Sequence, residues 1–317
     1  MPALPYPVTK ILLPYDGSAG ARQALELAAR LALAGGEAVQ GLTLLMVVGG
    51  GYVARHVQNV DLRVLRLERD RDWQRLRQRH LEEEVYPVLE EGRTWLRARG
   101  VAAPVEIRVA EGRVGDEIVR LAREEGFSTI VMGRRGLSPL KSLLLGSVTR
   151  RVLSLAEGLT VYVAALEPPR PAGTGLFPLL AAVDGSEPSL AALRQAAALI
   201  QACRPPAPSL TLVHVVDVAL LAEGFFEEPS RWVKEGEEVL RAAGEFLTAA
   251  GLQDGWEEKL LLGDPGDTIV AEAAAGGHPL IFLGSRGLSG LARLLVGSVT
   301  SRVVHQATQA AVAVVYL

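Results

Sequence analysis

Two glycine-containing stretches have the residue types and spacing that could bind an anion. Gly133-Arg134-Arg135-Gly136 is followed, after nine residues, by Gly146-Ser147. The same pattern returns 151 residues further on as Gly284-Ser285-Arg286-Gly287, nine residues and Gly297-Ser298. Glycine lets the backbone approach a ligand closely, and the N–H groups at a helix start favour negative charge. The pattern therefore indicates a phosphate site in each copy. Glycines that merely turn the chain and serines that cap helices are the alternative interpretation.

The elements around each copy would present these groups together. A short apolar run, 128–132 or 279–283, precedes the glycines, and a helical pattern begins near Ser147 or Ser298. Each copy is thus predicted to be a strand, a glycine loop and the first turn of a helix. The predicted phosphate-binding groups are the backbone N–H groups of Gly133, Gly136, Gly146, Ser147 and Val148, and in the second copy those of Gly284, Gly287, Gly297, Ser298 and Val299.

A second signature is also repeated. Asp16-Gly17-Ser18 follows the apolar run 10–15, and Asp184-Gly185-Ser186 follows 179–183, at an offset of 168 residues. The offset falls to 151 by the glycines at positions 112 and 263, so the first half has about 17 more residues between its second and third strands. This extra length coincides with a charged insertion around residues 50–78.

The order of the predicted elements gives the fold class. Strands alternate with helices as β-α-β-α-β-α-β-α-β, once in each half. Because such crossovers are right-handed, the helices would cover both faces of a parallel sheet, which is an α/β fold. The Pro- and Gly-rich stretch 168–175 is interpreted as a linker between a first domain, 1–167, and a second domain, 176–317.

The glycine signature resembles that of the universal stress protein family, whose ATP-binding members carry Gly, two residues, Gly, nine residues and Gly-Ser or Gly-Thr after the fourth strand. The chain is similar to a tandem member over nearly its whole length. The resemblance implies two doubly wound, Rossmann-like sheets with strand order 3-2-1-4-5. Ligands in such sheets bind where the winding reverses, between strands 1 and 4. Asp16 and Gly133 would therefore meet at one crevice, and Asp184 and Gly284 at another.

The resemblance also implies the ligand. ATP would occupy each crevice, with Mg²⁺ carried by its phosphates and a main-chain group of Val47 or Val215 beside the adenine. Asp16 and Asp184 would hold the nucleoside end, although aspartate at this position also suits a helix cap. Arg134, which stands where the second copy has Ser285, would either add a charged phosphate contact or crowd the loop.

The fifth strands, 159–166 and 311–316, would be open edges of the two sheets, and open edges pair readily. Members of the family commonly dimerise through this strand. The resemblance therefore implies that the two halves pair within the chain as a pseudo-dimer, and it leaves a further homodimer open.

The motifs exclude several classes of enzyme. The sequence has no Gly-x-x-x-x-Gly-Lys loop, no Gly-x-Ser-x-Gly elbow and no His-Glu-x-x-His pair. No catalytic residue and no protein metal cluster is predicted. We therefore expect an ATP-binding module that acts in a stress response by binding or signalling, with little or slow hydrolysis. An ATPase or nucleotidyl transferase on the same fold, and a structural member with unused sites, are the alternatives.

Composition limits the surroundings of the protein. The net charge of −3 gives no bulk attraction to nucleic acid or to an anionic membrane, and the single cysteine, Cys203, excludes an intrachain disulfide. Because no apolar run reaches the roughly 18 residues of a membrane helix, we expect a cytoplasmic protein. The insertion mixes arginines with acids at helical spacing, which indicates a solvated helix. It would serve as a lid over the first site or as an arm for a protein partner.

Overall fold

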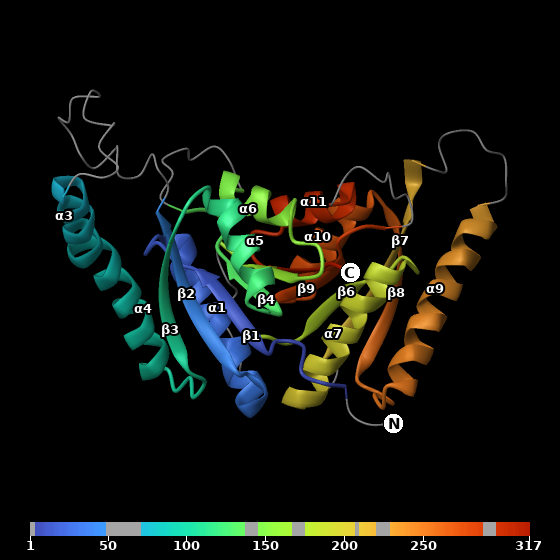
Figure 1. Cartoon of the computed structure of the whole chain (residues 1–317). Coiled ribbons are helices and arrows are strands. Elements are labelled where there is room, and N and C mark those ends of the chain that lie inside the picture. Colours follow the sequence, from blue (N-terminus) through green and yellow to red (C-terminus); the bar gives the residue numbers. More distant parts are fainter. Residues whose placement is uncertain are drawn as a thin grey trace.

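The computed structural model describes residues 4–48, 71–136, 145–166, 175–206, 209–219, 229–287 and 296–317. The described strands form one sheet in the order β3-β2-β1-β4-β5-β10-β9-β6-β7-β8, and its helices lie on both faces (Figure 1). Neighbouring strands run parallel except β5 and β10, which pair antiparallel. The order 3-2-1-4-5 predicted for each half is confirmed, because β8-β7-β6-β9-β10 repeats β3-β2-β1-β4-β5.

The first half alternates strands with helices, as its sequence pattern predicts. Its elements are β1 (Lys10–Pro14), α1 (Ala19–Gly35), the short 3-10 helix η1 (Gly36–Ala38), β2 (Gly41–Val48), α3 (Arg71–His80), the π-helical turn η3 (Leu81–Val85), α4 (Tyr86–Ala98), β3 (Val105–Glu111), α5 (Val114–Glu124), β4 (Thr129–Met132), α6 (Ser147–Leu153) and β5 (Thr160–Val163).

The second half repeats this order. Its elements are β6 (Leu179–Ala182), α7 (Glu187–Cys203), β7 (Leu210–Asp217), α9 (Pro229–Ala249), β8 (Trp256–Gly263), α10 (Pro265–Ala275), β9 (Leu280–Gly284), α11 (Ser298–Gln306) and β10 (Ala311–Val315). No helix within the described ranges is long and apolar enough to cross a membrane.

The central strands are apolar on both sides because each side faces a layer of helices. Along β4, Val131 joins the hydrophobic core under α1, α4, α7 and α9, while Ile130 and Met132 join the core under α5, α6, α10 and α11. Successive side chains of a strand point to opposite faces, so a strand covered on both faces is a continuous apolar run. Both cores extend across the two halves of the chain.

The two halves meet along β5 and β10. Val163 pairs with Val312, and Thr160 with Val315, so the strands predicted to be open edges close on each other. The intrachain pseudo-dimer is therefore confirmed. Tyr162 faces Ala313 across this seam, and its ring packs edge-on against Phe282 with the ring centroids 6.2 Å apart.

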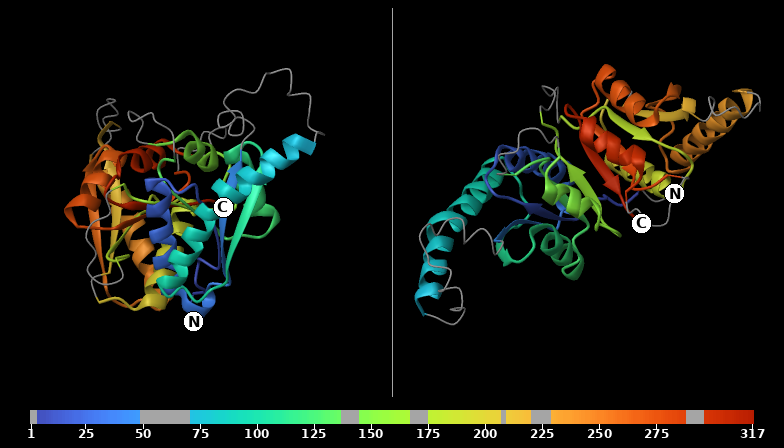
Figure 2. Two further views of the ribbon diagram at one scale, coloured as in Figure 1. Left: turned by 90° about the vertical axis from the view of Figure 1, so that its left-hand side faces the viewer. Right: turned by 90° about the horizontal axis from the view of Figure 1, so that it is seen from above.

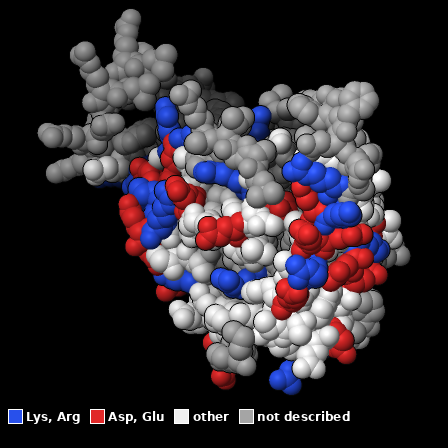
Figure 3. Space-filling model, turned by 90° about the vertical axis from the view of Figure 1, so that its right-hand side faces the viewer, with Lys and Arg blue, Asp and Glu red and all other residues white. Residues whose placement is uncertain are grey.

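The outer edges of the sheet are β3 and β8. On the outer side of the second half, Lys and Arg side chains are interspersed with Asp and Glu (Figure 3). On and beside β8, Lys259 forms ion pairs with Glu257 and Glu272. Charged side chains along an edge strand oppose pairing with another sheet.

The described part of the insertion is helical. The helix α4 begins at Tyr86 with Pro87 in its first turn. The turn before it, Leu81–Val85, is π-helical. The helix of the insertion runs into α4 without a break, because Val85 and Tyr86 have helical backbone angles and the N–H of Tyr86 donates to Leu81 O. The predicted stretch 50–70 and most of the linker 168–175 lie outside the described residues.

Candidate functional site

An Asp-Gly-Ser turn follows the first strand of each half. The backbone N–H of Ser18 donates to Asp16 Oδ1 at 3.0 Å, and that of Ser186 donates to Asp184 Oδ1 at 3.0 Å. The glycine between them has a positive φ, +72° at Gly17 and +81° at Gly185, which glycine adopts without strain. The sequence therefore forms the same tight turn twice, with one carboxylate oxygen held by the turn itself.

The aspartates do not cap the helices that follow. The side chain of Ser18 accepts the N–H of Ala21 at 3.2 Å, and that of Ser186 accepts the N–H of Ser189 at 3.3 Å. The interpretation of Asp16 and Asp184 as helix caps is therefore wrong, because the serine two residues later caps each helix. The carboxylates lie outside the helices, at the ends of the first strands.

The second glycine of each loop lies against this carboxylate. A methyl group at Gly136 would come within 2.6 Å of Asp16 Oδ2, and one at Gly287 would overlap Asp184 Oδ2. The aspartate and glycine signatures, far apart in sequence, thus meet in both halves between the first and fourth strands. A backbone without a side chain is needed for the carboxylate and the loop to be this close.

The first glycine of each loop packs against the first turn of a helix instead. A methyl group at Gly133 would overlap the backbone of Gly20 in α1, and one at Gly284 would come within 2.7 Å of the Ser189 nitrogen in α7. Gly133 and Gly284 therefore place the loop by close packing.

The loop is tied to the start of the following helix in the same way in both halves. The N–H of Gly146 donates to Arg134 O at 2.7 Å, and that of Gly297 donates to Ser285 O at 2.8 Å. The buried hydroxyls of Thr149 and Thr300 add bonds to Gly133 O at 2.9 Å and to Gly284 O at 2.7 Å. These threonines were not among the predicted site residues, although both stand in the repeated Gly-Ser-Val-Thr.

The two helices after the glycine loops begin without a side-chain cap. The N-cap residues of α6 and α11 are Gly146 and Gly297, and the first turn of neither helix contains an acid. By contrast, serines cap α1 and α7, Asp264 caps α10, and α5 has two acids in its first turn. The first turns of α6 and α11, with Ser147 and Ser298 exposed and Val148 and Val299 half-buried, suit an anion.

The ends of the second strands extend beyond the first strands. Leu45 O accepts the N–H of Tyr15, the residue after β1, and Val213 O likewise accepts the N–H of Val183 after β6. Backbone groups two residues apart on a strand point to the same side. The N–H and C=O groups of Val47 and Val215 therefore point past the ends of β1 and β6, toward the aspartate turns.

Arg134 does not lie where either sequence hypothesis put it. Its side chain is fully buried, and the guanidinium donates to Val304 O and Ala307 O of the second half. Because the side chain leaves its own loop, both the phosphate contact and the crowding are wrong. Burial lowers the pKa of this guanidinium to about 10. Ser285, its counterpart, is also buried.

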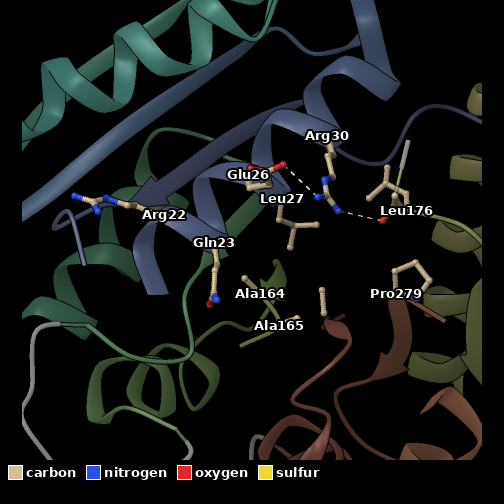
Figure 4. A pocket seen from close by; sticks show the side chains of 11 residues that line it. Arg22, Gln23, Glu26, Leu27, Arg30, Ala164, Ala165, Leu176 and Pro279 are labelled. Atoms are coloured by element: carbon tan, nitrogen blue, oxygen red, sulfur yellow. Dashed lines mark hydrogen bonds and ion pairs between the residues drawn. The ribbon is translucent and has the colours of Figure 1, made fainter. Parts of the chain in front are cut away.

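A hollow of about 400 Å³ lies at the seam rather than at either glycine loop (Figure 4). One wall is the charged face of α1, where Arg30 binds both Glu26 and Gly175 O, and small side chains such as Ala164 and Ala311 complete it. Asp16 and the described loop glycines do not line it. This hollow is therefore distinct from the predicted crevices.

The described end of the insertion lies beside β3, and β3 is two strands away from the crevice. Arg77 on α3 donates to Glu111 at the end of β3 with its Nε at 2.6 Å, and α3 extends outward from the sheet (Figure 2). Residues 71–78 thus flank the sheet beside its outer edge. The lid and the partner arm stay predictions, since residues 50–70 lie outside the described part.

Other candidate chemical groups are engaged in structure. His214 is half-buried, and its Nδ1 lies 2.8 Å from Val183 O. Burial raises the pKa of the Cys203 thiol, which makes it a weaker nucleophile. Over the described ranges, no cluster of three or more His, Cys, Asp or Glu could hold a metal ion.

Comparison with known proteins agrees with this architecture. The chain is 32% identical over 142 residues to a universal stress protein of Bacillus subtilis, which covers 41% of this chain and 93% of that protein. A universal stress protein from Archaeoglobus fulgidus has a similar fold over 97% of this chain and 98% of its own, with a TM-score of 0.67 and 23% identity. Another, solved in complex with cAMP, covers 44% of this chain and 95% of its own, with a TM-score of 0.34 and 25% identity. The model of the universal stress protein family matches residues 7–158 and 177–315, so the chain belongs to this family and contains two of its domains.

Proposed function

We propose that this protein binds two molecules of ATP, one at each glycine loop, and acts in the cytoplasm as a nucleotide-dependent binding or signalling module of a stress response. The observation that carries the proposal is the contact between an aspartate carboxylate and the second loop glycine, beside an uncapped helix, in both halves. A site built twice from the same parts favours a shared ligand over two accidental turns.

Each group at the crevice has a role in this proposal. The N–H groups of Gly136, Gly146, Ser147 and Val148 bind phosphate, and Asp16 accepts ribose hydroxyls through the oxygen that faces the loop. The main-chain groups of Val47 read the adenine edge. Gly287, Gly297, Ser298, Val299, Asp184 and Val215 have the same roles in the second half.

The residues fit a metal that arrives with the nucleotide. The absence of a ligand cluster in the described ranges leaves the phosphates to hold Mg²⁺. The chain also lacks the P-loop lysine, so we expect hydrolysis to be slow or absent. Occupancy by ATP, rather than turnover, would then be what a protein partner detects, either on one chain or on a pair of chains.

The first test identifies the nucleotide that the purified protein carries, by denaturing release, chromatography and quantification per chain. About two ATP per chain support the proposal. A chain without nucleotide that also shows no calorimetric binding of Mg-ATP contradicts it. Binding of cAMP in place of ATP would support nucleotide binding at these sites but contradict ATP as the ligand.

The second test assigns the two sites. Asp16→Ala and Asp184→Ala are each expected to reduce the calorimetric stoichiometry from two Mg-ATP to one. Asp254→Ala, which removes the same charge from an exposed position, leaves it at two. Phosphate release measured with the same samples separates a binding module from an ATPase.

A further inference from the structure

Arg134 connects the two halves of the molecule. Its guanidinium is fully buried, donates to Val304 O and Ala307 O, and lies 3.5 Å from Ala310 O. A buried cation is costly unless hydrogen bonds satisfy it, so these bonds to carbonyls of the second half hold the side chain in one position.

The carbonyls that it binds belong to the end of a helix of the proposed second site. Val304 lies in the last turn of α11, and Ala307 is its C-cap residue. The last carbonyls of a helix have no partner within it and have a partial negative charge. A guanidinium at this end therefore stabilises α11, whose other end begins at Ser298 in the second glycine loop.

The same residue is also tied to the first site. Arg134 O accepts the N–H of Gly146 at 2.7 Å and the hydroxyl of Thr149 at 3.3 Å, at the start of α6. One residue thus contacts the start of one site helix through its carbonyl and the end of the other through its side chain.

A reciprocal contact exists, with different chemistry. The hydroxyl of Tyr316, in the second half, donates to Leu153 O at the end of α6 at 2.6 Å. Leu153 and Val304 are equivalent, because 153 plus the repeat offset of 151 is 304. Each half therefore holds the last turn of the other half's site helix.

We propose that Arg134 is a positioning residue for the second site: from the first glycine loop it fixes α11 and thereby sets the affinity of the second loop for ATP. This inference rests on the proposed function. A small movement of α11 is enough, because N–H groups that bind phosphate lose affinity when the helix that carries them is displaced by a fraction of an ångström. The first loop then contributes to binding at a site that it does not touch.

The experiment measures only the second site. In an Asp16→Ala chain, calorimetry with Mg-ATP reports binding at the second loop, and Arg134→Met is then added. We expect the affinity to fall about fivefold or more, since couplings between sites are commonly of this size. Arg134→Lys, which retains a cation, is expected to recover part of the loss. Tyr162→Phe, a change at the same seam on the sheet face opposite α11, serves as the matched control and leaves the affinity unchanged.

A second measurement needs no ligand. Hydrogen exchange of the amides of Val303 to Ala307 is expected to accelerate about fivefold or more in Arg134→Met, because the end of α11 frays. Both measurements use a temperature at which circular dichroism shows each variant folded. Equal ATP affinity in the Asp16→Ala parent and its Arg134→Met derivative overturns the inference. A parent that binds no ATP contradicts the proposed function instead, and unchanged exchange shows that Arg134 does not hold the helix.

Discussion

The two glycine loops have the same backbone contacts but differ in the side chain that follows the first glycine. In the first loop, Arg134 crosses the seam and binds the end of α11. In the second loop, Ser285 is small and buried, and the equivalent bond across the seam comes from Tyr316 at the end of β10. The groups that shape the site are thus repeated, while the groups that join the halves have diverged.

This difference separates two kinds of constraint. A loop that must fit a carboxylate and a helix turn tolerates only glycine at fixed places, so both copies keep it. A helix end needs only a donor, which a guanidinium or a phenol can supply from different elements. Substitution of the shared glycines should therefore affect both halves alike, whereas substitution of the diverged groups should not.

The largest effect is expected from the shared glycines. Gly133→Ala and Gly284→Ala would each lower the free energy of unfolding by about 3 kcal/mol, because the new methyl group meets the backbone of α1 or α7, which cannot rotate away. Urea denaturation measures both. Gly41→Ala is the control: its nearest neighbour would be Pro104 O at 3.7 Å, and we expect a change below about 1 kcal/mol. A loss in only one loop would show that the loops are not equivalent.

The next largest effect on stability is expected in the first loop alone, at Arg134. Arg134→Met fills much of the same space but donates no hydrogen bond, so we expect a loss of about 2–3 kcal/mol from the carbonyls left unsatisfied. Ser285→Ala, at the equivalent position, is expected to cost less than about 1 kcal/mol. Thermal and urea unfolding of the two variants compare them directly. Equal losses would mean that the Arg134 guanidinium contributes no more to stability than the Ser285 hydroxyl does.

The reciprocal contact gives a dependence on pH. Tyr316→Phe removes the donor to Leu153 O, so at pH 8 we expect a loss of about 1–2 kcal/mol. Burial raises the pKa of the Tyr316 hydroxyl above its ordinary value of 10, so above pH 10 the unfolded chain releases this proton and the folded chain keeps it. This group alone then lowers the free energy of unfolding of the wild type by about 1.4 kcal/mol per pH unit. Phenylalanine has no proton to release, so the variant does not show this loss.

The difference in free energy of unfolding between wild type and Tyr316→Phe should therefore become smaller above pH 10. It should change sign about one to two pH units higher. Urea denaturation at pH 8, 10 and 11 follows it. A gap that stays constant over this range would show that the phenol ionises alike in the folded and unfolded chains.

The sequence predicted the parts of the site that depend on strand ends. Asp16 and Gly136 both follow strands, and neighbouring parallel strands end at the same edge of a sheet. The spacing does not fix the strand order; the family resemblance of the repeated motif implied that the first and fourth strands are neighbours. The sequence could not distinguish Asp16 from Ser18 as the helix cap, because both types suit that position. Only the place where α1 begins decides between them.

Side-chain direction at the seam was beyond the sequence. An arginine next to a predicted phosphate loop suggests a phosphate contact, and nothing local indicates that β5 and β10 bring the end of α11 within its reach. Thr149 and Thr300 were missed for a similar reason. Their place in a helical pattern hides that their hydroxyls bond back to the loop.

The smallest effect has the opposite sign. Tyr162 lies at the seam opposite Ala313, and its buried hydroxyl has no hydrogen-bond partner in the described part of the chain. Tyr162→Phe keeps the ring against Phe282 and removes a polar group whose burial costs free energy without a bond to offset it, so we expect the melting temperature to rise, with a gain of about 1 kcal/mol. The same change at Tyr316 should destabilise the protein at pH 8. Opposite signs from one substitution at two places on the seam would show that Tyr316 joins the halves by its hydroxyl and Tyr162 by its ring alone, whereas a loss at Tyr162 would mean that its hydroxyl, too, is a bond between them.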